Sequence, residues 1–318
     1  MNKKQIVLIG TSQIMQYHAS ALKESGLDLQ AVASSNLHSS SQVKFASRNN
    51  IPKNFSNWKE LLDQEQYDGI IIGTRIESTL EILEYAIKQN VPILVEKPVS
   101  VNSTDLKNLI KKSHKLIMVG FNRRFYHTVN TLKNLIEIEN TPVIANMVIP
   151  ESNLQNFFTN SIHSIDLLRY VFGDIKLEFS KKLIKNKMVN GVTATFSNKK
   201  NDLIQLTGIW NAPANVSLSV FSEKKQFELK PYETLKIFDD LKVIEPTANE
   251  PIRKYAPKLM EQIDLEPIDK KFKPGFFQQS NSFSELIKTK KKSNYAATLT
   301  DTLHSIEICE KLVGKFPN

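Results

Sequence analysis

A charged pair closes one of the most apolar strands that the sequence predicts. Glu96-Lys97-Pro98 follows the run at residues 91–95, and in open α/β sheets ligands bind beyond the carboxyl ends of the strands. A partly desolvated lysine at such a place can polarise a hydroxyl oxygen or, as the neutral amine, accept the proton of that hydroxyl. The arrangement therefore predicts that Glu96 and Lys97 face a ligand-binding crevice, with a solvent-exposed turn as the alternative.

Residues 10–15 join the first predicted strand to its helix, where a dinucleotide-binding fold places the pyrophosphate. They form an incomplete G-x-G-x-x-G fingerprint, because Ser12 and Met15 stand where the second and third glycines are expected. Backbone amides and the helix dipole are available whatever the side chains are. The loop is interpreted either as a nucleotide site or as a plain turn. Its candidate cofactor residues are Gly10, Thr11, Ser12, Gln13 and Ile14.

The second predicted strand ends in Ser34-Ser35, where an acidic residue ordinarily binds the ribose hydroxyls of NAD. A pair of small hydroxyl groups could instead accommodate the phosphate of NADP, with Lys44 or Arg48 as candidate counter-charges. A polar turn at the strand end is the alternative. Ser34 and Ser35 are therefore candidate cofactor residues, and the expected cofactor is NAD or NADP.

The elements that would position these residues alternate between strand and helix. Solid apolar runs predict strands that are buried on both faces, at residues 5–9, 29–33, 69–73, 93–95 and 117–120. Helical spacing occurs between them, at residues 12–25, 40–47, 77–88 and 104–113, with residues 58–62 continuing the alternation. The pattern predicts a doubly wound parallel sheet of the Rossmann type, an α/β fold, over residues 1–121.

The pattern changes after residue 121. Helices are predicted at residues 129–138 and 162–171, followed by alternating strands between residues 177 and 245. The turn signals between the strands are residues 190–191, 197–201 and 222–225. Residues 122–318 should therefore form a second domain, a largely antiparallel sheet with helices on one side. A proline-rich stretch, residues 246–274, is expected to be irregular before final helices at residues 276–288 and 296–313.

Composition limits the classes of protein that the chain can belong to. With 318 residues, 41% hydrophobic and 24% charged, it is typical of a folded globular protein of two domains. We see no signal-peptide pattern and no apolar run near the ~18 residues of a membrane span, so we expect a cytoplasmic protein without a membrane partner. Cys309 is the single cysteine, which excludes an intrachain disulfide and a thiolate metal cluster. We expect no metal site.

The formal net charge of +9 comes from scattered lysine blocks beside predicted turns. No helix-turn-helix, zinc-finger or aromatic-basic pattern accompanies them, so a solvated surface is favoured over a nucleic-acid interface. A basic surface would attract anionic substrates over distance, which is compatible with a sugar nucleotide or a carboxylated sugar. We expect no nucleic-acid partner.

Five segments of the chain resemble the Gfo/Idh/MocA oxidoreductases in order and spacing: residues 6–10, 69–74, 95–98, 119–125 and 163–169. A sixth segment, residues 274–279, is similar to the family too. The resemblance covers essentially the whole chain. It implies an N-terminal Rossmann domain, a C-terminal α/β domain on a large open sheet, and NAD(P)-linked oxidation or reduction of a sugar, polyol or sugar nucleotide. It also implies a homodimer or homotetramer that pairs through the outer face of that sheet.

The same resemblance assigns roles to individual residues. It makes Lys97 and His163 the catalytic pair, with Lys97-Pro98 a candidate for a cis bond. For His163 the alternative is a satisfied core histidine, and for Glu96 it is a solvent-facing pair with Lys97. One of Arg123 and Arg124 could face an anionic substrate while the other pairs with a carboxylate. The remaining candidates are Thr74, Arg75, Glu96 and again Lys97 for the cofactor, and Asn122, Arg124 and Thr159 for the substrate.

Departures from the family pattern cluster near the cofactor and the proton-handling residues. Thr159 stands where the family often has an aspartate, and Arg75 and Thr79 replace a proline and a histidine. The leading hypothesis is an NAD(P)-dependent oxidoreductase that acts on a CH-OH group of a sugar, polyol or sugar nucleotide. The alternative is a redox-silent family member that acts as a binding or scaffold protein with a decayed nucleotide loop.

Overall fold

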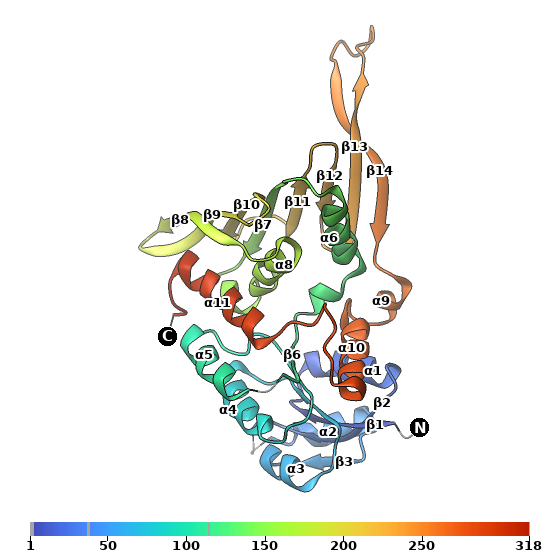
Figure 1. Ribbon diagram of the computed structural model, residues 1–318, viewed down its shortest axis with the longest axis vertical. Coiled ribbons are helices and arrows are strands. Elements are labelled where there is room, and N and C mark those ends of the chain that lie inside the picture. The colour runs from blue at the N-terminus through green and yellow to red at the C-terminus, as the bar shows by residue number, and fades with distance from the viewer. Residues whose placement is uncertain (1–2, 37–38, 114, 318) are drawn as a thin grey trace.

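Two sheets, one parallel and one mostly antiparallel, organise the protein (Figure 1). The computed structural model describes residues 3–36, 39–113 and 115–317. The parallel sheet belongs to the first part of the chain and the second sheet to the part after residue 143. The sequence-based prediction of an α/β fold with a Rossmann sheet and a mostly antiparallel second sheet is confirmed.

The parallel sheet has six strands in the order β3-β2-β1-β4-β5-β6. The strands are β1 (Lys4–Ile9), β2 (Leu27–Ala33), β3 (Lys53–Phe55), β4 (Gly69–Ile72), β5 (Ile93–Val95) and β6 (Ile117–Val119). The helices between them are α1 (Gln13–Glu24), α2 (Ser41–Arg48), α3 (Trp58–Gln64), α4 (Ile76–Ile87) and α5 (Ser103–Lys112). The strand order reverses between β1 and β4, which creates the crevice where such folds bind ligands.

A helix from near the C-terminal end of the chain covers part of one face of the parallel sheet. α10 (Phe276–Thr289) packs against α1, and Phe283 and Ile287 join the apolar cluster that contains Ile6. A Cβ atom on Gly69 would lie 2.9 Å from the Cδ1 atom of Ile287, so β4 and α10 are in close contact. This packing explains why the strands are apolar on both faces.

The second sheet has eight strands in the order β14-β13-β12-β11-β7-β10-β9-β8. They are β7 (Ile144–Glu151), β8 (Lys176–Lys185), β9 (Met188–Ser197), β10 (Leu203–Trp210), β11 (Ser217–Phe221), β12 (Gln226–Leu229), β13 (Thr234–Ile244) and β14 (Lys254–Asp264). All neighbouring pairs are antiparallel except β7 and β10. The remaining helices are η1 (Asn122–Phe125), α6 (His127–Glu139), α7 (Leu154–Thr159), α8 (Ile162–Phe172), α9 (Pro267–Lys271) and α11 (Leu299–Val313). Helices α6, α8 and α11 lie on one side of the sheet in Figure 1.

Two sequence-based predictions about this domain are wrong. Residues 190–191 are predicted as a turn but lie inside β9, and the turn is made by Asn186 and Lys187, which both have positive φ. Gly191 serves a close approach instead, because a Cβ atom there would lie 2.7 Å from the carbonyl oxygen of Gly208. Residues 246–274, predicted to be irregular, contain β14. Pro257 is tolerated because β14 is an edge strand.

Helix boundaries differ from the predictions by a few residues. The last helix begins at Leu299, three residues later than predicted, because Thr298 and Asp301 form a capping box. Cys309 is buried on this helix and is a free thiol. Within the described ranges, no helix is long and apolar enough to cross a membrane.

Candidate active site

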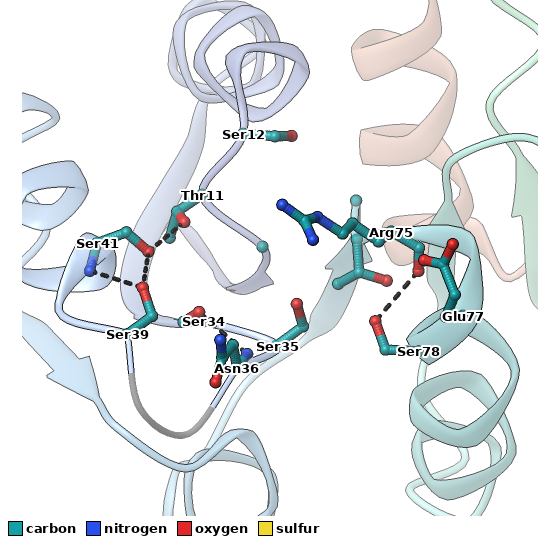
Figure 2. A pocket seen from close by; sticks show the side chains of 13 residues that line it. Thr11, Ser12, Ser34, Ser35, Asn36, Ser39, Ser41, Arg75, Glu77 and Ser78 are labelled. Atoms are coloured by element: carbon teal, nitrogen blue, oxygen red, sulfur yellow. Dashed lines mark hydrogen bonds between the residues drawn. The ribbon is translucent and has the colours of Figure 1, made fainter.

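A cavity of about 710 Å³ opens at the carboxyl ends of β1, β2 and β4 (Figure 2). Seven predicted cofactor residues line it together: Gly10, Thr11, Ser12, Ser34, Ser35, Thr74 and Arg75. Of the described residues, Gln13 and Ile14 lie just beyond the lining, in the first turn of α1. The switch point of the parallel sheet therefore carries the pocket that its topology predicts.

The incomplete glycine fingerprint has a structural compensation on β4. Gly10 has φ of +115°, and a Cβ atom there would collide with the carbonyl oxygen of Gly73. Met15 is fully buried and occupies the space that a Cβ atom of Gly73 would need. The glycine that allows α1 to pack closely on the sheet is therefore at position 73 instead of position 15.

We expect Gly73→Ala to lower the free energy of unfolding by about 1–3 kcal/mol, because its methyl group would overlap the Met15 thioether. In a Met15→Ala background, the same substitution should cost little, since the obstructing atoms are gone. Urea unfolding of the four proteins in this cycle measures the difference. An equal loss in both backgrounds would contradict the compensation.

The N-terminus of α1 offers hydrogen-bond donors to the cavity. Ser12 is the N-cap of α1 and makes no side-chain capping bond within the described structure. The first amides of a helix have no partner inside the helix, and they bind anions readily. In Figure 2 the guanidinium group of Arg75 points across the cavity toward Ser12 and away from Glu77. These donors and this cation suit a pyrophosphate, so the residues present fit a dinucleotide.

The candidate catalytic corner, residues 96–98, lies at the end of β5. Lys97-Pro98 is a cis peptide bond, and Lys97 Nζ donates a hydrogen bond to the backbone carbonyl oxygen of Thr159 at 3.0 Å. Burial lowers the pKa of Lys97, and the charge of Glu96 offsets only part of this effect. Lys97 therefore releases its proton more readily than a solvated lysine.

His163 lies in the first turn of α8 and is buried. Its ring meets Phe121 edge-on at 5.6 Å between centroids, and its Nδ1 atom has no hydrogen-bond partner among the described residues. Burial, followed by the charges of Lys97 and Arg123, holds the pKa of His163 well below its ordinary value. The imidazole is therefore neutral. Its buried unpartnered nitrogen favours a functional role over that of a satisfied core residue.

Glu96 turns away from the ammonium group of Lys97. Its Oε1 atom lies 2.7 Å from Nε2 of His18, and its Oε2 atom accepts the backbone N–H of Lys97 at 3.2 Å. Gly120 makes room for this carboxylate, because a Cβ atom there would lie 2.8 Å from Oε1. Glu96 thus ties the corner to α1. His18 is missing from the sequence-based site, although its spacing from Ile14 places it on the inner face of the helix.

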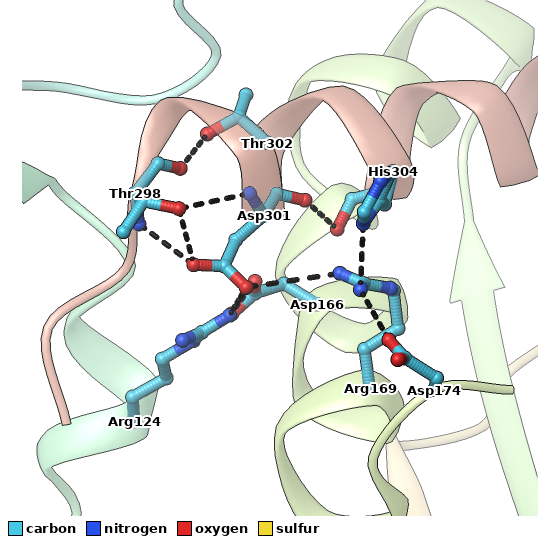
Figure 3. Close-up of polar contacts among 9 residues, drawn as sticks. Arg124, Asp166, Arg169, Asp174, Thr298, Asp301, Thr302 and His304 are labelled. Atoms are coloured by element: carbon cyan, nitrogen blue, oxygen red, sulfur yellow. Dashed lines mark hydrogen bonds and ion pairs between the residues drawn. The ribbon is translucent and has the colours of Figure 1, made fainter. Parts of the chain in front are cut away.

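The two neighbouring arginines have different environments. Arg124 is 5% exposed and forms a bidentate pair with Asp166, at 2.8 Å and 2.6 Å (Figure 3). Its guanidinium group is therefore engaged in a buried pair, and its place among the substrate residues stays a prediction. Arg123 lies over the ring of Tyr232 at 5.1 Å and donates to Ser164 at 3.4 Å. The positive charge of Arg123 lowers the pKa of Lys97 and the pKa of His163. Arg123 is therefore the arginine near the candidate catalytic corner.

The other two candidate substrate residues contact their surroundings through different atoms. Asn122 is buried, and its Nδ2 atom donates to the carbonyl oxygen of Pro274 at 2.9 Å, which anchors η1 to the segment before α10. Thr159 contributes its backbone carbonyl to Lys97, while its hydroxyl group donates to the carbonyl oxygen of Gln155. The structure thus places Thr159 at the catalytic corner and Asn122 in its support.

A carboxylate that the sequence did not point to lies close by. Glu151, at the end of β7, accepts hydrogen bonds from Ser161 at 2.7 Å and Asn160 at 3.1 Å. Its charge raises the pKa of Lys97, against the larger effect of burial. Glu151 holds the segment that presents the Thr159 carbonyl to Lys97. Glu151 therefore supplies a negative charge near Lys97, although position 159 has no carboxylate.

The N-terminal domain that carries this cavity matches a known protein family. Residues 4–121 match the oxidoreductase family with an NAD-binding Rossmann fold, Gfo/Idh/MocA. This match identifies residues 4–121 as an NAD-binding Rossmann domain of the Gfo/Idh/MocA oxidoreductases. The family resemblance predicted from the sequence is confirmed, and the crevice between β1 and β4 lies within the matched domain.

Characterised relatives of this chain are distant. Myo-inositol 2-dehydrogenase of Thermotoga maritima is 23% identical over 185 residues, which cover 54% of this chain and 55% of the relative. Inositol 2-dehydrogenase of Salmonella typhimurium is 22% identical over 135 residues, 38% of this chain and 40% of the relative. The match thus spans about half the length, or less, of these relatives.

Solved structures extend the likeness of fold to the whole chain. Myo-inositol dehydrogenase from Corynebacterium glutamicum superposes with a TM-score of 0.72 at 17% identity, covering 97% of this chain and 95% of the other. Levoglucosan dehydrogenase in complex with NADH and L-sorbose gives 0.77 at 14% identity, covering 98% and 95%. An Agrobacterium radiobacter oxidoreductase in complex with NAD+, L-tartaric acid and magnesium gives 0.76 at 13% identity, covering 97% and 95%.

Proposed function

We propose that the protein is an NAD(P)-dependent oxidoreductase that transfers hydride to or from the hydroxyl-bearing or keto carbon of a sugar, polyol or sugar nucleotide. The observation that carries this proposal is a partly buried Lys97 with a lowered pKa beside a neutral His163 whose Nδ1 atom has no hydrogen-bond partner, at the end of a strand next to the cofactor crevice. The names of the relatives, inositol and levoglucosan dehydrogenases, support the substrate class. In this proposal residues 1–121 bind the cofactor, and residues 122–318 bind substrate and form the subunit contact.

The residues of the chain handle the proton of the reaction. A bound nicotinamide supplies the acceptor or donor of hydride. When the alcohol is oxidised, the hydroxyl proton passes to the neutral amine of Lys97, which the Thr159 carbonyl holds in place. His163 is neutral and can hydrogen-bond the same substrate oxygen or its neighbour. Arg123 lies close enough to both for its charge to orient an anionic group of the substrate.

The proposed roles predict the pH dependence of oxidation. Because the neutral amine of Lys97 is the base, kcat should rise with pH, and burial places the apparent pKa of this limb below the ordinary lysine value of 10.5. His163 is already neutral, so no inflection is expected near its ordinary pKa of 6.5. The pH profile of His163→Asn should keep the limb of Lys97 at a lower overall rate. Loss of the limb in that variant would assign the titration to His163.

A substrate panel tests the function. The purified protein is incubated with NAD+ or NADP+ and with polyols, aldoses and sugar nucleotides, and the formation of reduced nicotinamide is followed by absorbance. Turnover with at least one class of substrate is expected. Absence of turnover with every class and both cofactors, in a protein that is folded by circular dichroism, would favour the redox-silent binding protein.

The proposal includes a homodimer or homotetramer that pairs through the outer face of the second sheet, and a cytoplasmic location. Ile144, Leu203 and Phe221 occupy neighbouring positions on β7, β10 and β11, and all three are exposed. An exposed apolar cluster on a sheet face is typical of a subunit contact. Light scattering measures the mass in solution, and a monomer at all concentrations would contradict this contact.

A further inference from the structure

Hydroxyl groups are the most frequent side-chain groups in the lining of the cofactor cavity. Eight of the 13 residues that line the cavity carry a hydroxyl side chain. Three of them form a continuous chain, in which Ser41 Oγ lies 2.7 Å from Thr11 Oγ1 and 2.8 Å from Ser39 Oγ (Figure 2). Ser34 and Ser35 extend this lining at the end of β2. Loops that follow β1 and β2 thus present their hydroxyl groups to one region.

The end of β2 lacks the carboxylate that is expected where a protein binds the unphosphorylated ribose of NAD. A carboxylate at the end of the second strand accepts the ribose hydroxyls of NAD, and it would repel a phosphate at the same place. Here Ser34 and Ser35 occupy that place, and Glu77, on α4, is the only acidic side chain in the lining that the structure describes. Figure 2 shows Glu77 on the opposite side from Ser39 and Ser41.

A phosphate monoester matches these features better than a diol does. Its oxygens accept several hydrogen bonds at once, and serine hydroxyls are free to rotate toward them as donors. Ser35 is partly exposed in the cavity. Arg75 is the one cation among the described residues that line the cavity, and it adds a favourable long-range field for a cofactor with an extra phosphate.

We propose, on the basis of the function proposed above, that the cavity prefers NADP(H) to NAD(H). The 2′-phosphate is bound by the hydroxyl groups of Ser34 and Ser35 at the end of β2 and by those of Ser39 and Ser41 at the start of α2. The departures from the family pattern at this strand end thus set the choice of cofactor.

Calorimetric titration of the full chain with NADPH and NADH tests the preference without any turnover. NADPH should bind at least about tenfold more tightly, as expected for charge-assisted hydrogen bonds to a phosphate. Ser35→Asp places a carboxylate beside the phosphate, so it should weaken NADPH at least about tenfold while NADH is retained or improved. Ser35→Asn has the same size without the charge and should change either affinity much less.

The adenosine half can be examined separately through thermal unfolding. We expect 2′,5′-ADP to raise the Tm of the wild type more than 5′-ADP does, and this difference should disappear in Ser35→Asp. Equal or tighter binding of NADH by the wild type, or an equal loss of both cofactors in Ser35→Asp, would overturn the preference alone. If neither cofactor bound, the proposed oxidoreductase function would fall together with it.

Discussion

Replacing Lys97 with methionine is expected to lower kcat by a factor of about 10² to 10⁴, the usual contribution of a positioned acid or base. The affinity for the nicotinamide cofactor should change little, because Lys97 Nζ contacts the Thr159 carbonyl and not the loop at residues 10–12. Methionine keeps the length and the apolar stem of the side chain, so the packing of the cis corner is preserved. Steady-state kinetics and a separate cofactor titration measure the two effects.

Lys97→Arg is the matched control for this prediction. Arginine keeps the positive charge but does not lose its proton in proteins, so it can attract a substrate oxygen but cannot accept a proton from it. We therefore expect Lys97→Arg to be nearly as inactive as Lys97→Met. Substantial activity in the arginine variant would show that the charge alone is what the site requires, and normal turnover in the methionine variant would remove any catalytic role.

The second large effect is expected at Asp166. Asp166→Ala should lower the free energy of unfolding by about 3–5 kcal/mol, because it leaves the buried Arg124 without its bidentate partner. Burial raises the pKa of Asp166, while the adjacent Arg124 opposes that effect. Asp301, at 3.3 Å from Arg124, extends the pair to α11, so the network joins η1, α8 and α11 (Figure 3). Chemical unfolding monitored by circular dichroism measures the loss.

Two further variants distinguish this structural role from catalysis. Arg124→Met combined with Asp166→Leu removes both charges, and it should be much less destabilising than Asp166→Ala. Arg123→Ala alters the neighbouring residue and should leave the unfolding midpoint nearly unchanged while lowering kcat/KM. If Asp166→Ala unfolded at the wild-type midpoint, the structural assignment of the pair would be wrong.

Local sequence pattern predicted five of the six strands of the parallel sheet and missed β3, and it was not enough for part of the second domain. β4 and β5 are buried on both faces, so their sequences are apolar without interruption. β14 is an exposed edge strand that contains Pro257, and its sequence has neither the apolar run nor the clean alternation that marks a strand. The glycine at position 191 resembles a turn signal because close backbone approach and tight turns both select glycine.

The candidate site was predictable where its residues follow one another in the chain. Lys97 ends a strand, and the two arginines follow another, so their places were evident from the sequence. Which arginine pairs with Asp166 depends on side-chain direction within η1, which the sequence does not specify. Met15 packs where a Cβ atom of Gly73 would lie, and the two residues belong to elements that are far apart in the chain. This contact could be seen only in the folded structure.

Titration of the purified protein with NADH and with NADPH, followed by nicotinamide fluorescence, tests the central claim most directly. The intact packing of α1 on the sheet and the donors around the cavity predict a saturable signal with at least one of the two cofactors. The absence of a saturable signal with either cofactor into the millimolar range would contradict the claim that this chain is a nicotinamide-dependent oxidoreductase.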